Sequence, residues 1–194
     1  MKKLTNVKQL TNLKYLNMFQ ATFENDAGKE LKYNIASRKS IDNLAVTGKR
    51  KDDAVRIIPF FYEDNKTKVV LIKEFRYPIN DYIFGVPAGL IDEGESPEDS
   101  AKRELEEEIG ASVISLVQTE ISSFSSAGMS DESLICFEAE VKIDKKQNLG
   151  NFEDIKINVV DLDELENMLD TQNFGLQSRL QLRCFLYKNL LKIK

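Results

Sequence analysis

The strongest constraint on the fold is a pair of apolar runs separated by a short polar break. The runs are AVRIIPFFYE at residues 54–63 and TKVVLIKEF at residues 67–75, and the intervening DNK is typical of a turn. Runs of this length, rich in Val, Ile and Phe and bounded by turn residues, predict two strands joined as a β-hairpin. A sheet is therefore expected in the fold.

Five more runs resemble strands. Residues 16–24 and 31–37, joined by NDAGK, predict a second hairpin, and strands are also expected over 114–124 and 133–141. INVVDL predicts a short strand, followed by a short helix over DLDELENMLD. A sheet flanked by helices, in mixed α/β or α+β layers, is the architecture that this order favours.

The two ends of the chain give weaker signals. Residues 1–11 are polar and predict a loose arm or a short helix. Residues 176–193 have the spacing of an amphipathic helix. The residues expected on its apolar face are Leu180, Cys184, Tyr187 and Leu191.

A third segment carries helix start and stop signals. Ser96 suits an N-cap, Pro97 suits the first helical position, and Asp99 completes a capping box. Gly110 suits the C-terminal end, so a helix is predicted over 97–109. The residues expected to face the core from this helix are Ala101, Leu105 and Ile109.

The last turns of this helix are crowded with carboxylates, because Glu104, Glu107 and Glu108 fall on one side. Like charges one turn apart repel by roughly 0.2–0.5 kcal/mol, and negative charge at a helix C-terminus costs roughly 0.3–1 kcal/mol more. A solvated charged face is the alternative interpretation, but such a face would favour lysines at this end. A bound divalent cation would reverse both penalties. Arg103 is expected to pair with a neighbouring carboxylate and to hold its rotamer.

The chain contains no histidine, which excludes whole classes of site. A Ser-His-Asp triad, a Cys-His pair and a His-ligated zinc are all impossible. Acid–base or metal chemistry must therefore use carboxylates, whose oxygens favour hard cations such as Mg²⁺ or Mn²⁺. The net charge of -5 argues against a nucleic-acid partner.

Composition also bears on location. Cys136 and Cys184 both lie in apolar surroundings, so buried free thiols in a reducing cytoplasm are expected. The N-terminal lysines are not followed by an apolar stretch, and no run is long enough for a membrane span. A cytoplasmic protein with no membrane partner is therefore expected.

The spacing around the acidic helix resembles the Nudix box, whose pattern is G-x5-E-x7-R-E-U-x-E-E-x-G-U, with U a bulky aliphatic residue. Here the pattern runs from Gly89 through Glu95 and Arg103 to Gly110, and only the final U departs from it, because Ala111 is small. The resemblance implies the α+β class, as an α/β/α sandwich with a mixed sheet. It also implies hydrolysis of a nucleoside diphosphate linked to another group, with Mg²⁺ or Mn²⁺ as cofactor.

The resemblance assigns roles by position. Glu104, Glu107 and Glu108 match the metal ligands, and the carbonyl of Ala88 is a further candidate ligand. Glu107 is also expected to act in catalysis, together with Arg103. The residues that match the supporting positions of the box are Gly89, Glu95 and Arg103.

Segments outside the box resemble ADP-ribose pyrophosphatases. Residues 1–53 are similar to their small N-terminal strand subdomain, which implies a homodimer, and residues 54–194 are expected to be the hydrolase domain. EFRYPINDYIFGVPAG is similar to their approach to the box. The resemblance makes Arg76 and Arg38 candidate substrate-binding residues.

SSFSSAGMSDES resembles the catalytic loop of that group, in which a glutamate positions or deprotonates water. Glu132 matches that glutamate, with Asp131 as the neighbouring alternative, and Ala127 departs from the proline that many members carry. Hydrolysis of ADP-ribose to AMP and ribose 5-phosphate is the favoured hypothesis. The alternatives are another nucleotide substrate (a nucleoside diphosphate sugar, a dinucleotide or capped RNA) and a non-catalytic nucleotide sensor.

Overall fold

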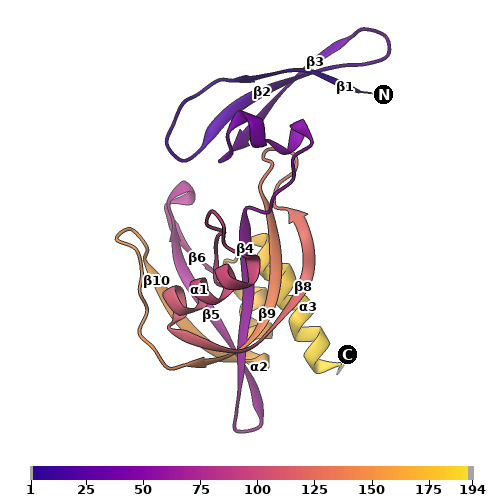
Figure 1. The fold of residues 1–194 in the computed structure, drawn as a ribbon. Coiled ribbons are helices and arrows are strands. Elements are labelled where there is room, and N and C mark those ends of the chain that lie inside the picture. Colours follow the sequence, from indigo (N-terminus) through magenta and orange to yellow (C-terminus); the bar gives the residue numbers. More distant parts are fainter. Residues whose placement is uncertain (1, 192–194) are drawn as a thin grey trace. The chain divides into compact units, whose positions relative to one another are not determined.

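The computed structural model describes residues 2–191, which fall into two compact units (Figure 1). The N-terminal unit contains the residues up to 53 together with 122–134. The larger unit contains residues 54–121 together with those from 135 onward.

The N-terminal unit is built on a three-stranded antiparallel sheet in the order β1-β2-β3. The predicted hairpin is confirmed as β2 (Asn17–Glu24) and β3 (Glu30–Ser37). The prediction of a loose arm or short helix over residues 1–11 is wrong, because β1 (Lys3–Gln9) pairs with β2. A register shift between Leu4 and Asn6 interrupts the alternation of β1, so its half-buried residues do not follow the two-residue period that marks a strand.

Residues 122–134 are tied into this unit by hydrogen bonds. The backbone N–H of Ala36 on β3 donates to the carbonyl of Met129 at 2.9 Å. The buried carboxylate of Asp131 accepts from the backbone N–H of Ala45 at 2.9 Å, and Asp53 accepts from the backbone N–H of Ser133 at 2.8 Å.

The larger unit is built on a sheet in the order β10-β5-β4-β9-β8, with β6 paired to β5 and β7 to β4. The second predicted hairpin is confirmed as β4 (Ala54–Glu63) and β5 (Lys66–Arg76). Asp64 and Asn65 turn the chain at φ 49° and 60°, a conformation that these residue types tolerate well. The remaining strands are β6 (Asp81–Gly85), β7 (Ala88–Leu90), β8 (Ala111–Phe124), β9 (Ser133–Ile143) and β10 (Ile155–Asp161).

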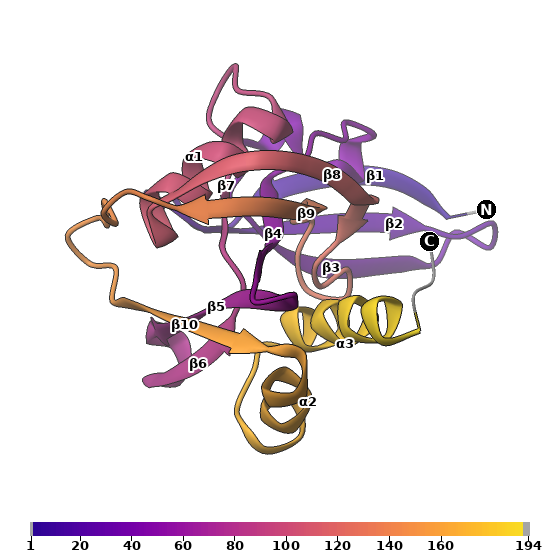
Figure 2. The same ribbon diagram turned by 90° about the horizontal axis from the view of Figure 1, so that it is seen from below.

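Helices cover both faces of this sheet (Figure 2). Val70 and Ile72 of β5 pack in one core with α1 (Pro97–Ile109). Val69 and Leu71 alternate with them and pack in a second core with the other two helices. Those helices are α2 (Leu162–Thr171) and α3 (Leu176–Leu190). The predicted α/β/α sandwich with a mixed sheet is confirmed.

Two predictions about the C-terminal helix are wrong. The face expected to be apolar and packed is exposed at Leu180, Tyr187 and Leu191, and Cys184 is exposed as well, whereas Cys136 is buried as expected. The buried residues of α3 are Ser178, Leu182, Phe185 and Leu186. Because α3 carries apolar residues on more than one face, spacing does not identify the packed one. Ile193, at the end of the predicted helix, lies outside the described residues.

Within residues 2–191, no helix combines the length and apolar character that crossing a membrane requires.

Candidate active site

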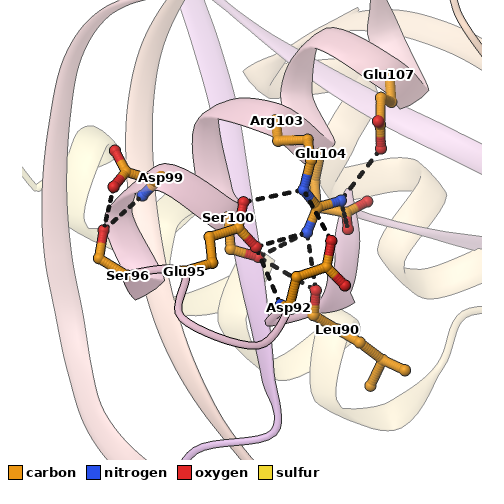
Figure 3. Close-up of polar contacts among 9 residues, drawn as sticks. All are labelled: Leu90, Asp92, Glu95, Ser96, Asp99, Ser100, Arg103, Glu104 and Glu107. Carbon is orange, nitrogen blue, oxygen red and sulfur yellow. Dashed lines mark hydrogen bonds and ion pairs between the residues drawn. The ribbon is translucent and has the colours of Figure 1, made fainter.

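The acidic helix begins and ends as its sequence predicts. The hydroxyl of Ser96 accepts a hydrogen bond from the backbone N–H of Asp99 at 3.1 Å (Figure 3). Gly110 adopts the left-handed conformation at φ 64°, and its N–H donates to the carbonyl of Glu106 at 3.0 Å. The expected core residues Ala101, Leu105 and Ile109 are fully buried, which fixes the rotation of the helix about its axis.

A distant segment caps the C-terminal end of α1. The backbone N–H of Asn148 donates to the carbonyl of Glu107 at 2.8 Å, and the side-chain amide of Gln147 donates to the carbonyl of Glu108 at 2.6 Å. The N–H of Lys145 donates to the carbonyl of Gly110 at 2.9 Å. These bonds satisfy carbonyls that a helix end leaves without partners. They therefore fix the backbone of the last turn, which carries the carboxylates.

The guanidinium of Arg103 forms hydrogen bonds with three neighbouring carboxylates (Figure 3). It donates to both oxygens of Glu95, from Nε at 3.0 Å and from Nη2 at 2.9 Å. Its Nη1 donates to Glu104 at 2.6 Å and to Glu107 at 3.2 Å. The carbonyl of Leu90 accepts from Nη2 at 2.9 Å. The predicted pairing of Arg103 with a carboxylate one turn away is therefore present, and it extends to Glu95 beyond the helix.

The Arg103–Glu95 pair is fixed in its charged form. Hydrogen bonding to Arg103 lowers the pKa of Glu95 to about 2. The reciprocal hydrogen bond from Glu95 raises the pKa of Arg103 above its ordinary value. The bidentate fork also fixes the orientation of the guanidinium, so Arg103 can present one nitrogen to Glu104 and Glu107.

Glu104 and Glu108 differ from Glu95 because they are buried. Their exposed fractions are 8% and 6%. Burial raises the pKa of Glu104, and burial followed by repulsion from Glu104 raises the pKa of Glu108 well above its ordinary value. The N–H of Ala88 donates to Glu108 at 3.3 Å, which offsets this only in part. Burial thus acts against the charge of both carboxylates, and Arg103 offsets this in part at Glu104.

Gly89 is required by the position of Glu104. A Cβ atom at residue 89 would lie 1.8 Å from Oε1 of Glu104, so any side chain there would displace the carboxylate. The glycine that opens the box thus has a steric role, which the spacing of the motif indicates without explaining.

The donor set fits a hard divalent cation. Carboxylate oxygens are the ligands that Mg²⁺ and Mn²⁺ prefer, and a cation would favour the charged forms of the buried pair. Among residues 2–191, no three side chains of the His, Cys, Asp and Glu types are arranged to hold a metal ion. Two of the three expected ligands, Glu104 and Glu107, instead contact Arg103.

Two carboxylates outside the motif also act on the box. Glu74 of β5 and Glu153, which precedes β10, both raise the pKa of Glu108 by charge repulsion, and Glu153 does the same to Glu104. Burial raises the pKa of Glu74 itself. Neither residue lies in the motif, and the pairing of β10 with β5 that positions them joins residues far apart in sequence.

The remaining candidate residues have their own partners. Arg76 is half-exposed and pairs with Glu74 at 3.0 Å in the larger unit. In the N-terminal unit, Arg38 lies 3.6 Å from Glu132, which also accepts from the hydroxyl of Ser125 at 2.7 Å. Asp131, the alternative to Glu132, is buried and holds backbone and lysine partners. The geometry thus distinguishes the two neighbours, since only Glu132 is paired with a candidate substrate-binding residue.

Comparison with known proteins adds relatives of stated activity. The chain is 34% identical over 108 residues to the ADP-ribose pyrophosphatase of Bacillus subtilis, covering 54% of this chain and 57% of that protein. It is 28% identical over 186 residues to the ADP-ribose pyrophosphatase of Saccharomyces cerevisiae, covering 90% of this chain and 78% of that protein. The match to the Bacillus protein thus spans little more than half of its length.

A solved structure and a family match agree with these relatives. The fold is similar to the crystal structure of an ADP compounds hydrolase, with a TM-score of 0.75, 19% identity, and coverage of 98% of this chain and 94% of that chain. Residues 50–179 match the NUDIX domain. This region contains α1, its Arg103 network and the sheet that supports them, and the chain therefore belongs to the NUDIX family.

Proposed function

We propose that the protein is a pyrophosphohydrolase that cleaves the diphosphate bond of ADP-ribose to give AMP and ribose 5-phosphate. The observation that carries the proposal is the buried pair Glu104 and Glu108, oriented beside the Arg103–Glu95 clamp. Burying two like charges destabilises a fold even where Arg103 pairs with Glu104, so their presence favours a functional role. The names of the Bacillus and yeast relatives support ADP-ribose as the substrate.

Glu104, Glu107 and Glu108 would hold the divalent cation, Mg²⁺ or Mn²⁺, with the carbonyl of Ala88 as a further candidate ligand. When bound, such an ion would neutralise part of the charge of the diphosphate and lower the pKa of a bound water. Arg103 would keep Glu104 and Glu107 oriented, while Glu95 holds the guanidinium in place. Arg76 and Arg38 would bind the anionic substrate through their guanidinium groups.

Two carboxylates compete for the role of positioning the attacking water. Glu132 is favoured by its loop and by its pairing with Arg38. Glu153 is favoured by its electrostatic interaction with Glu104 and Glu108. Glu153 would act beside carboxylates that are already crowded, so orienting water suits it better than storing a proton.

A phosphatase-coupled assay tests the substrate. AMP and ribose 5-phosphate carry terminal phosphates that a phosphatase removes, whereas intact ADP-ribose does not. Phosphate release from ADP-ribose is expected with Mg²⁺ or Mn²⁺ and should stop on chelation with EDTA. A panel of nucleoside diphosphate sugars, dinucleotides and capped RNA separates the alternatives, and the net charge of -5 disfavours RNA. Binding of ADP-ribose without turnover of any nucleotide would instead identify a sensor.

We also propose that the protein is a cytoplasmic homodimer in which the N-terminal strands of one subunit contribute to the site of the other. Large apolar side chains are exposed in the N-terminal unit, which favours burial against a partner. They include Leu13, Tyr15, Leu16, Leu31 and Tyr33.

A further inference from the structure

An exposed aromatic side chain lies next to one of the site carboxylates. Phe152 is 84% exposed, although its backbone is well held. The hydroxyl of Tyr77 donates to the carbonyl of Phe152 at 2.9 Å. Gly150 and Glu153, on either side, exchange two hydrogen bonds, one from the N–H of Glu153 at 3.0 Å and one to its carboxylate at 2.7 Å. A segment fixed in this way presents the ring of Phe152 to solvent at little conformational cost.

Tyr77 belongs to the same surface and is also held. The residue is 64% exposed, and its ring packs edge-on against Phe75, with centroids 5.2 Å apart. Phe75 packs in turn against Tyr82 at 5.2 Å, and the hydroxyl of Tyr82 is bonded to Asp154. The N–H of Phe75 donates to the carbonyl of Asp154 at 3.2 Å. The end of β5 is therefore joined to the segment that carries Phe152 by this backbone bond and by the hydroxyl of Tyr77.

This aromatic surface adjoins charged groups that suit a diphosphate. Glu153 follows Phe152 directly, and Ile155, two residues further along, pairs with Glu74 of β5. Arg76 precedes Tyr77 directly and pairs with Glu74. The exposed ring of Tyr77 thus directly follows a guanidinium that suits phosphate oxygens, and its hydroxyl joins it to the segment that carries Phe152. A nucleotide offers matching groups, because its phosphates are anionic and its base is flat.

We propose that Phe152 and Tyr77 form a stacking platform for the nucleobase of the nucleoside diphosphate substrate. The inference rests on the proposed function, because it names a contact made by the base of the same substrate. Stacking uses the face of a base and not its hydrogen-bonding edge, so this contact selects for the presence of a base more than for its identity. Discrimination among bases would then have to come from other groups.

A fluorescence experiment tests the contact without relying on turnover. The chain contains no tryptophan, so Phe152→Trp introduces a single indole at the platform. AMP, in buffer with Mg²⁺, is expected to quench this indole, because the base stacks on it. Ribose 5-phosphate, which has the phosphate and the sugar but no base, is expected to leave the signal unchanged at the same concentration.

Tyr62→Trp is the matched control, because Tyr62 is also an exposed aromatic residue of the larger unit and lies at the end of β4. Quenching by AMP in Phe152→Trp alone supports the platform. Equal quenching in both variants, or none in Phe152→Trp while the wild type hydrolyses ADP-ribose, overturns the platform and leaves the proposed function standing. Absence of hydrolysis of every nucleotide by the wild type rejects the proposed function whatever the fluorescence shows.

Kinetics give a second readout. Phe152→Ala is expected to raise KM by about 5- to 100-fold, the range that loss of one base stack gives, with little change in kcat. Phe152→Tyr keeps a stacking face and should restore KM. The side chain is exposed, so both variants should unfold like the wild type. An unchanged KM in Phe152→Ala together with a reduced mass in light scattering would mean that a second copy of the chain covers this surface, and the proposal would be wrong.

Discussion

The guanidinium of Arg103 reaches Glu95, Glu104 and Glu107 at the same time, and this geometry requires an arginine. A lysine offers one point charge, whereas the planar fork binds both oxygens of Glu95 and still directs a nitrogen to the helix carboxylates. Each carboxylate of the group therefore has a different environment. Glu95 is held ionised by Arg103, while burial acts against the charge of Glu104 and Glu108.

Replacing Glu108 tests the role of the buried charge. Glu108→Gln keeps the shape of the side chain but removes the charge, and it is expected to lower kcat on the order of 10²–10³-fold, as when an electrostatic contribution to the transition state is lost. Folding should be preserved, since the substitution removes a buried group whose pKa is raised by burial. Steady-state kinetics with ADP-ribose and thermal unfolding measure the two effects.

The matched control is Glu106→Gln, which makes the same chemical change on the exposed side of the same helix, where Glu106 pairs with Lys145 at 2.6 Å. Exposed pairs of this kind contribute about 0–1 kcal/mol, so this variant should keep its activity. A folded Glu108→Gln protein with kinetics like those of Glu106→Gln would reject the metal assignment.

The water-positioning residue is the second prediction at this scale. Glu132→Gln is expected to lower kcat about 10²–10⁴-fold with a smaller change in KM, the range of a positioned base. Asp131→Asn should act on stability instead, because Asp131 is buried and accepts from the N–H of Ala45. Glu153→Gln is the competing variant. A larger loss of kcat in Glu153→Gln than in Glu132→Gln would move the role to Glu153, and no loss in any of the three would leave water activation to the box and its cation.

At the scale of elements, turn and cap residues predict the hairpins and the helix ends, because interactions between neighbouring residues determine these features. The two hairpins and the caps of α1 follow from turn residues and from Ser96 and Gly110. The sequence does not predict β1 because a bulge breaks its alternation, and it does not identify the packed face of α3 because apolar residues occupy more than one side. The two differences share a cause. In both elements, contacts with distant parts of the chain determine the structure, and the local sequence is compatible with more than one outcome.

The N-cap of α1 gives a prediction at this scale. Ser96→Ala removes the acceptor for the N–H of Asp99 and should lower the free energy of unfolding by about 0.5–2 kcal/mol. Ser96→Asp supplies another good N-cap and should recover most of that stability. Urea denaturation followed by circular dichroism measures the difference. Equal losses in the two variants would indicate that the Ser96 side chain contributes through some contact other than the cap.

At the scale of the whole molecule, the chain assembles the box surroundings from distant segments. The end of α1 is capped by Lys145, Gln147 and Asn148. Two carboxylates that act on Glu108, those of Glu74 and Glu153, come from a strand and a loop that lie outside the motif in the sequence. Spacing alone predicts that the proposed ligands Glu104, Glu107 and Glu108 lie together beside Arg103, because all four share one helix. It did not identify the long-range partners, because nothing in their local sequence records which helix end or strand they will meet.

The homodimer proposal gives the prediction at this scale. Static light scattering at micromolar concentration is expected to give twice the mass of one chain, because exchange of N-terminal strands would bury the exposed apolar side chains of that unit. A complementation experiment goes further. Glu108→Gln inactivates the larger unit, and Arg38→Ala removes the proposed substrate-binding arginine of the N-terminal unit. Refolded together in equal amounts, the two inactive variants should recover roughly a quarter of wild-type activity, because half of the dimers are mixed and each mixed dimer has one intact site. A monomer mass would reject the dimer, and a dimer without recovery would mean that each site is completed by its own chain.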